Sequence, residues 1–113
     1  MNQKEIWLVN LDPTLGSEMK KTRPSVILND DSIGVLPLKI IAPITDFKIT
    51  YKEVPWMVII HPDKLNNLKK DSVIDLFQIR SVSEERLIKK LGSISEKNLE
   101  EAKYALKVVF DID

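Results

Sequence analysis

Residues 20–30 read KKTRPSVILND, and this stretch contains the structural unit that recurs through most of the chain. A polar loop ends at Pro24, whose ring fixes the backbone and introduces an apolar strand over 25–28. The strand stops at the turn-forming cluster 29–32, NDDS. Short strands between turns are typical of small β barrels and sandwiches.

The same unit recurs on both sides of this stretch. The third predicted strand, over 38–44, contains Pro43, which has no backbone N–H to donate to a ladder. That end of the strand is therefore predicted to be an edge or a bulge. Up to about Ile79 the sequence predicts only strands and turns. The further strands are predicted over 6–11, 38–44, 56–60 and 72–76.

After Ile79 the sequence predicts helices. Ser83 can cap a short helix over 84–91, which Gly92 would end. Ser95 can cap a second, longer helix, in which apolar residues recur three or four positions apart. This apolar stripe, which predicts a helix packed on the sheet, consists of Leu99, Ala102, Leu106 and Val109. The predicted fold class is therefore mostly β with a C-terminal α-helix.

The composition excludes several kinds of protein and site. The 113 residues leave room for one domain, 1–113, and no apolar run approaches the ~20 residues that span a bilayer. Without a recognisable signal peptide or any cysteine, a cytoplasmic protein is expected. The single histidine, His61, excludes a ribonuclease mechanism based on a histidine pair. Seventeen cationic and seventeen acidic residues cancel, so binding of a nucleic acid would depend on a local basic cluster.

Four short segments stand out when they are considered together. They read DPTLGSE at 12–18, TRP at 22–24 before an apolar strand, APIT at 42–45 and QIRSV at 78–82. Each motif alone is weakly specific, but their order and spacing over nearly the whole chain resemble the MazF/PemK toxin family.

This resemblance implies a fold, an activity and partners. The family fold is a small SH3-like barrel of the CcdB/PemK type with a C-terminal helix, and it pairs as a homodimer. The family consists of type II toxin–antitoxin endoribonucleases, or mRNA interferases, which cut single-stranded RNA at a short sequence without a metal ion or cofactor and leave a cyclic phosphate. A MazE-like antitoxin silences them, and no membrane is involved.

The resemblance also implies site residues. Arg23 matches the family's catalytic arginine, and Thr45 matches its catalytic threonine. The loop that flanks the substrate groove matches Gly16, Ser17 and Glu18. The chain departs from the family pattern after this loop, where Met19, Lys20 and Lys21 replace small residues, so the recognised RNA sequence stays open.

Elementary chemistry assigns roles to the same residues. When a 2′-hydroxyl attacks phosphorus, negative charge gathers on the phosphoryl oxygens, and the rigid fork of Arg23 is suited to stabilise it. A threonine hydroxyl is too weak an acid to be ionised near neutral pH, so it cannot supply the base. Thr45 is therefore expected to orient the 2′-hydroxyl or a phosphoryl oxygen by hydrogen bonding. Glu18 is the better general-base candidate on acidity alone.

Each of these residues also has an ordinary structural explanation. Arg23 can be a surface cation paired with Asp30 or Glu18, and Thr45 can be a β-favouring residue at a strand end. Lys20 and Lys21 can be a solvated pair, although they and Gln78 are candidate RNA contacts. Among the aromatic residues, Phe47 and Tyr51 are candidate contacts with RNA or antitoxin, whereas Trp7 and Phe77 are expected in the core.

Two other functions compete with RNA cleavage. A toxin on the same barrel can poison DNA gyrase by binding, which predicts function at the C-terminal helix and no need for Arg23. A non-catalytic barrel that binds RNA or a peptide would retain binding after Arg23→Ala. The TRP and APIT segments favour the endoribonuclease.

Overall fold

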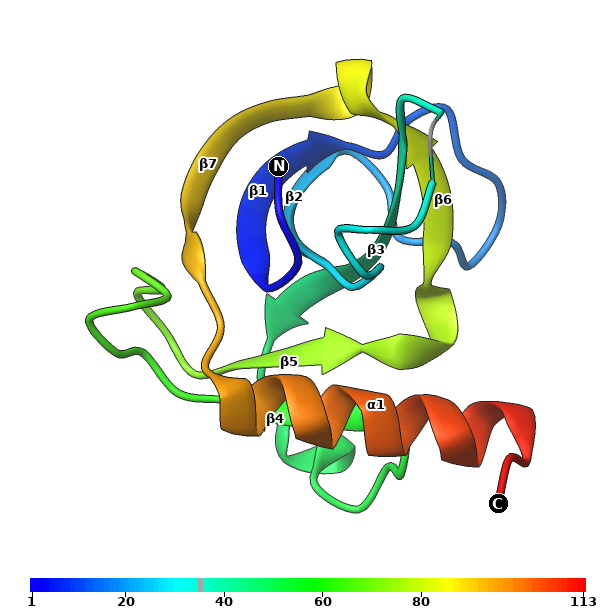
Figure 1. Cartoon of the computed structure of the whole chain (residues 1–113). Helices are drawn as coiled ribbons and strands as arrows, with labels where there is room; N and C mark the ends of the chain where they lie inside the picture. Colours follow the sequence, from blue (N-terminus) through cyan, green and yellow to red (C-terminus); the bar gives the residue numbers. More distant parts are fainter. Residues whose placement is uncertain (35) are drawn as a thin grey trace.

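The computed structural model describes residues 1–34 and 36–113, and over these residues it forms one antiparallel β system and one α-helix (Figure 1). The strand order is β4-β5-β3-β2-β1-β7, and β6 pairs with β3. The strands are β1 (Glu5–Asn10), β2 (Thr22–Ile27), β3 (Leu38–Asp46), β4 (Met57–Ile60), β5 (Ser72–Asp75), β6 (Arg80–Ser83) and β7 (Leu87–Ser93). Three short 3-10 turns, η1 (Ile49–Tyr51), η2 (Leu76–Gln78) and η3 (Glu84–Arg86), interrupt them before α1 (Glu96–Phe110). The predicted class, mostly β with a C-terminal helix, is confirmed.

The long strand β3 connects the two ends of the sheet because it changes neighbours along its length. On one side it pairs with β2 over 41–43, and on the other it pairs first with β6 over 38–41 and then with β5 over 44–46. Pro43 lies between the β6 and β5 ladders, where the chain needs no donor on that side. The strand is therefore not an edge strand, and the proline marks the place where the neighbour changes.

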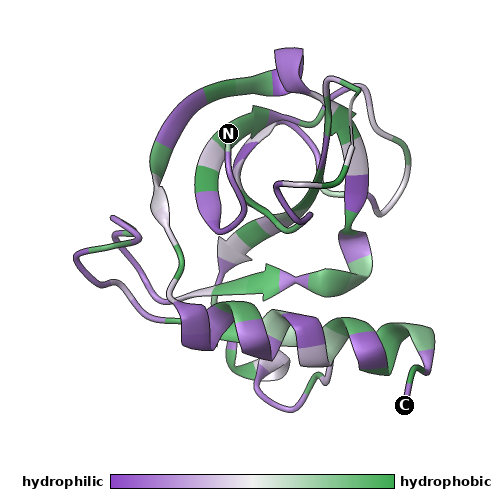
Figure 2. Ribbon diagram, viewed as in Figure 1, coloured by the Kyte–Doolittle hydropathy of each residue, from purple (hydrophilic) through white to green (hydrophobic). Residues whose placement is uncertain are grey.

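Helix α1 covers one face of the sheet, as the apolar stripe predicted. Leu99 and Ala102 are fully buried in a core cluster with Ile6, Val26 and Ile44, and Leu106 packs against it. Val109 is half-buried, and Ala105 takes a buried place in the stripe. Figure 2 shows hydrophilic residues along the outer side of the helix. The Ser95 side chain accepts a hydrogen bond from the Asn98 amide, so the predicted N-cap is confirmed.

The predicted helix over 84–91 is wrong. Ser83 does cap a turn, but η3 ends after three residues and β7 follows. β7 pairs with β1 from Glu5↔Ser93 to Val9↔Leu87, so pairing across the sheet overrides the local helix signal. Gly92 does not end a helix; it lies inside β7.

A second core cluster lies inside the curved part of the sheet, around Val9, Ile27, Ile41 and Val82.

Among the described residues, no helix is long and apolar enough to cross a membrane.

Candidate functional site

The structure brings Arg23 and Thr45 together, although they are 22 positions apart in the chain. β2 and β3 run antiparallel with Ser25 opposite Pro43, and the same register carried two residues further sets Arg23 opposite Thr45. The Arg23 Nη1 atom donates to Thr45 Oγ1 over 3.3 Å, and Arg23 Nε donates to the Lys20 carbonyl over 3.3 Å. Both side chains are half-buried, so the pair lies at the surface in a fixed orientation.

Arg23 has no carboxylate partner within 4.0 Å in the part of the chain that the structure describes. The structure therefore does not support the alternative in which Arg23 pairs with Asp30 or Glu18. A guanidinium has five N–H donors, and the contacts with Thr45 and Lys20 use two of them. The remaining donors are available to an anion.

A pocket of about 290 Å³ surrounds this pair. Besides Arg23 it contains two more cations, Lys69 and Lys70, and one carboxylate, Asp46. Lys70 Nζ lies 3.5 Å from Asp46 Oδ2, so one cation is partly compensated. The remaining lining residues are Thr22, Pro24, Ile44, Leu68 and Ser72. The pocket is thus locally basic in a chain whose net charge is zero.

The sequence analysis missed Lys69 and Lys70. They lie in a polar loop that belongs to none of the four motifs, and solvated lysine pairs are common. The available signal is their place just before β5, whose pairing with the end of β3 brings Ser72 opposite Asp46. That signal becomes visible only when the strand order is known.

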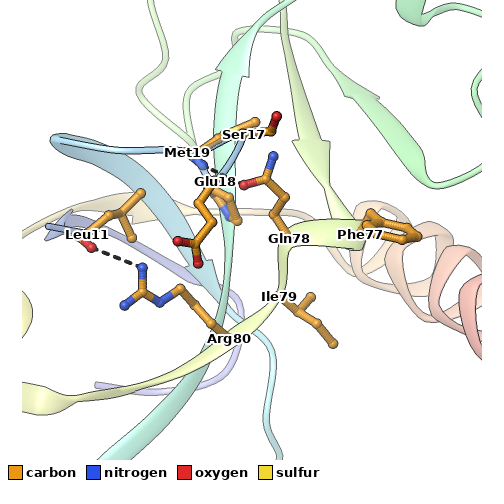
Figure 3. Close-up of a pocket in the computed structure, with 9 residues that line it drawn as sticks. Leu11, Ser17, Glu18, Met19, Phe77, Gln78, Ile79 and Arg80 are labelled. Carbon is orange, nitrogen blue, oxygen red and sulfur yellow. Dashed lines mark hydrogen bonds between the residues drawn. The ribbon is translucent and has the colours of Figure 1, made fainter. Parts of the chain in front are cut away.

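A second pocket, of about 470 Å³, adjoins the first along β3. Pro43 lines the second pocket and Thr45 lines the first, and residues two positions apart point to the same face of a strand. Figure 3 shows the second pocket, which is lined by Leu11, Ser17, Glu18, Met19, Pro43, Phe77, Gln78, Ile79 and Arg80. Three predicted site residues, Ser17, Glu18 and Gln78, are therefore together.

Hydrogen bonds fix the wall of the second pocket. Gln78 Oε1 accepts from the Met19 amide over 2.6 Å, and Arg80 Nη1 donates to the Leu11 carbonyl over 3.0 Å (Figure 3). Both contacts join the loop between β1 and β2 to the segment around η2. The side chain of Gln78 thus positions the loop that carries Glu18.

Asp75 caps the short turn η2, which carries Gln78. Its side chain is 4% exposed, and burial raises the pKa of this carboxyl, while hydrogen bonds from Phe77 and Gln78 partly offset the shift. Its Oδ1 accepts from the Phe77 amide over 3.0 Å and so caps η2. A capped turn gives Gln78 a defined position.

Glu18 lies one pocket away from the Arg23–Thr45 pair. Its Oε1 accepts from the Leu15 amide over 2.6 Å, and its side chain is exposed. Gly16, in the same loop, has φ of +56° and open space where a Cβ would be, so its backbone conformation explains the glycine.

The other predicted RNA contacts lie outside both pockets. Lys20 and Lys21 are exposed, and Lys20 contributes its carbonyl to Arg23 rather than a side chain to either lining. Phe47 lines a separate pocket with His61 and Asp71. The predicted set therefore divides into the Arg23–Thr45 pair, the residues of the second pocket and those of the surrounding surface.

One aromatic prediction is wrong. Phe77 was expected in the core, but it is 64% exposed, and its ring centroid lies 5.5 Å from that of Trp56. The reason is η2, in which Leu76 takes the fully buried place and the next residue turns outward. Trp7 is half-buried and packs against the second core cluster.

Known proteins resemble this chain over nearly its whole length. The family model described as "PemK-like, MazF-like toxin of type II toxin-antitoxin system" matches residues 2–110. The chain is 38% identical over 109 residues to a protein named endoribonuclease MazF from Staphylococcus saprophyticus, covering 96% of this chain and 89% of that protein.

Two solved structures share the fold. The crystal structure of MazF from Deinococcus radiodurans has a TM-score of 0.79 and 22% identity, with 98% of this chain and 96% of that chain covered. A mycobacterial endoribonuclease in complex with its cognate antitoxin has a TM-score of 0.80 and 12% identity, with 100% and 97% covered. Because the family model matches residues 2–110 of its 113 residues, this chain belongs to the family of PemK-like and MazF-like toxins of type II toxin–antitoxin systems.

Proposed function

We propose that this protein is an endoribonuclease toxin that cuts single-stranded RNA, including mRNA, at a short sequence without a metal ion. The observation that carries the proposal is the contact between Arg23 and Thr45 inside a basic pocket. The 38% identical relative is named an endoribonuclease, which supports the same activity.

The reaction begins with attack by the ribose 2′-oxygen on the neighbouring phosphorus. The bond between the 2′-oxygen and phosphorus forms, and the bond to the 5′-oxygen breaks. The departing 5′-oxygen takes a proton from water, so the products end in a 2′,3′-cyclic phosphate and a 5′-hydroxyl. Negative charge grows on the phosphoryl oxygens on the way. The unused N–H donors of Arg23 stabilise that charge, and the Thr45 hydroxyl orients the attacking group.

A base must take the proton of the 2′-hydroxyl, and we assign this role to Glu18. Its carboxylate lines the pocket that adjoins the reactive pair, so a ribose bound between the two pockets would face both. The test is the pH dependence of kcat/KM for the wild type and Glu18→Gln. We expect an acid limb that disappears in the variant; an unchanged profile would remove Glu18 from this role.

Ser17 and Gln78 frame a place for a neighbouring base in the second pocket, and Gly16 gives the loop that carries Ser17 its turn. Outside both pockets lie Lys20, Lys21 and Phe47. These residues would contact the RNA where it leaves the two pockets. This division predicts that changes at Gln78 alter which sequence is cut, whereas changes at Lys20 alter affinity for any sequence.

The protein acts as a homodimer in the cytoplasm, where mRNA is found, and a MazE-like antitoxin silences it. The mycobacterial structure is described as a complex with a cognate antitoxin, which supports such a partner here. An acidic and apolar tail can cover the basic pocket and displace RNA. We expect antitoxin and RNA to compete; a stable complex with both in the groove would contradict this model.

The deciding experiment is cleavage of a long single-stranded RNA in excess EDTA by the wild type, Arg23→Lys and Arg23→Ala. We expect cutting at a few sites, at least a hundredfold loss in Arg23→Ala and a smaller loss in Arg23→Lys, which keeps the charge without the fork. Cutting by Arg23→Ala at the wild-type rate would refute the mechanism. No cutting by the folded wild type would favour a toxin that binds its target, with gyrase tested next.

A further inference from the structure

The loop over residues 61–71, between β4 and β5, is built around one buried side chain. Asn66 is fully buried, and its side chain makes three hydrogen bonds inside the loop. Its Nδ2 donates to the His61 carbonyl over 2.9 Å, and its Oδ1 accepts from the amides of Asp63 and Leu68 over 3.1 and 2.9 Å. A satisfied buried amide of this kind fixes a single loop conformation.

The same loop is held against the end of β7. The Ser93 amide donates to the Leu65 carbonyl over 3.0 Å, and Asn67 Nδ2 donates to the Leu91 carbonyl over 2.9 Å. Between them lies Gly92, where a Cβ would come within 2.6 Å of the Leu65 carbonyl oxygen. The loop can lie this close only because residue 92 has no side chain. Figure 1 shows the loop over 61–71 beside the end of β7 and the start of α1.

This anchoring determines where the next residues lie. Leu68 packs against the core cluster, and Lys69 and Lys70 follow it into the wall of the Arg23 pocket. Lys70 is paired with Asp46, whereas Lys69 makes no ion pair within residues 1–34 and 36–113. The chain therefore places an uncompensated ammonium group beside the reactive pair.

We infer that Lys69 and Lys70 form a second phosphate subsite, which binds the RNA phosphate next to the one that Arg23 contacts. The inference rests on the proposed function for its ligand, single-stranded RNA. Three cations and one carboxylate in a single pocket of a neutral chain concentrate positive potential at this place. Lys69 binds the phosphate directly, and Lys70 exchanges part of its contact with Asp46 for the same phosphate.

The test uses an RNA that cannot be cut. A fluorescein-labelled single strand of about twelve 2′-O-methyl nucleotides of random sequence is titrated with the wild type at several salt concentrations. In Lys69→Gln we expect roughly fivefold weaker binding near 0.1 M salt. We also expect a plot of log K against log salt whose slope is smaller in magnitude by about 0.7, as for one lost phosphate contact. Lys69→Arg should bind as the wild type does.

The matched control is Lys64→Gln. Lys64 belongs to the same loop and is exposed, but it does not line the pocket. The inference predicts that this change leaves both the affinity and the salt dependence unaltered. Equal effects of Lys69→Gln and Lys64→Gln would overturn it, because the loop would then contribute only general charge.

The two proposals can fail separately. If the protein cuts RNA but Lys69→Gln binds the uncut strand normally, the subsite is wrong and the endoribonuclease stands. If Lys69→Gln weakens binding but the wild type cuts nothing, the subsite stands and the assigned reaction is wrong. Absence of any binding by the wild type would overturn the subsite.

Discussion

Two loops border the Arg23–Thr45 pair, and they are held in place in different ways. The loop over 11–21 is fixed by three side chains from outside it, Gln78, Arg80 and Arg86, which bond its amides and carbonyls. The loop over 61–71 is fixed from inside by Asn66 and is bonded to β7, where Gly92 leaves room for it. Side chains of other elements therefore hold the first loop, whereas the second depends most on one buried side chain and on the absence of a side chain at residue 92.

The largest difference is expected from Asn66→Ala. The substitution leaves the amides of Asp63 and Leu68 and the His61 carbonyl without their partner, so we expect the free energy of unfolding to fall by about 2–4 kcal/mol. The comparator is Asn10→Ala at the exposed end of β1, whose side chain bonds the Asp12 amide of the first loop, with a loss of about 0.5 kcal/mol. Denaturant unfolding measures both, and equal losses would refute the contrast.

Gly92→Ala should be the next most damaging. Its Cβ meets backbone atoms of Leu65 and Asn66 at 2.6–2.8 Å, so the loop must move, at a cost of about 2 kcal/mol. Because Lys69 moves with the loop, RNA binding should weaken too. Gly16→Ala in the first loop meets no atom and has only its left-handed backbone to strain, about 1 kcal/mol. The opposite order in thermal unfolding would show that the close approach at Gly92 is unimportant.

Acid pH should weaken the contribution of a charged carboxylate to stability but not that of a neutral amide. Burial alone would raise the pKa of Glu5, but hydrogen bonds from Trp7 and Asn2 and the charges of the amino terminus and Lys90 lower it to about 2. A lowered carboxyl pKa adds stability that is present above the unfolded-state pKa, near 4.5, and is lost as the pH falls toward 2.

We therefore expect Glu5→Gln to cost about 1–2 kcal/mol near neutral pH and almost nothing near pH 2. The cost of Asn66→Ala should stay constant over the same range, since its hydrogen bonds involve an uncharged amide. Unfolding measured from neutral to acid pH checks both. A constant cost for Glu5→Gln would contradict the lowered pKa.

A small effect on stability is expected from Gln78→Ala, at about 1 kcal/mol or less, because Arg80 and Arg86 still hold the first loop. Its effect should appear instead as a several-fold rise in KM for RNA at unchanged kcat. Gln3→Ala loses a comparable bond, to the Leu28 carbonyl, away from both pockets. If both variants raise KM equally, Gln78 has no special role in the loop.

The contrast between the loops also explains what could be predicted from the sequence. Two of the four motifs, 12–18 and 78–82, lie in the first loop and among its anchors, and the other two, 22–24 and 42–45, lie in β2 and β3. The family resemblance that these motifs carry singled out Arg23, Thr45, Ser17 and Gln78. The Arg23–Thr45 contact follows from a register that no local pattern specifies.

The errors have two causes. Residues 87–91, predicted as part of a helix, pair with β1, so the partner across the sheet decides the outcome. Phe77 lies in an apolar segment but is turned outward by the short turn η2, in which Leu76 takes the buried place. Lys69 was missed because its place in the pocket depends on the strand that follows it, whose pairing the sequence does not specify.

The partner exchange along β3 has a consequence for timing. Arg23 belongs to the strand paired with the middle of β3, whereas Thr45 lies in the part of β3 that pairs with β5. A chain still emerging from a ribosome lacks β5 until residue 75 has been made, and it lacks α1 for longer. The pocket around the Arg23–Thr45 contact is therefore completed late, because Lys69, Lys70 and Ser72, which line it, are made after β2 and β3.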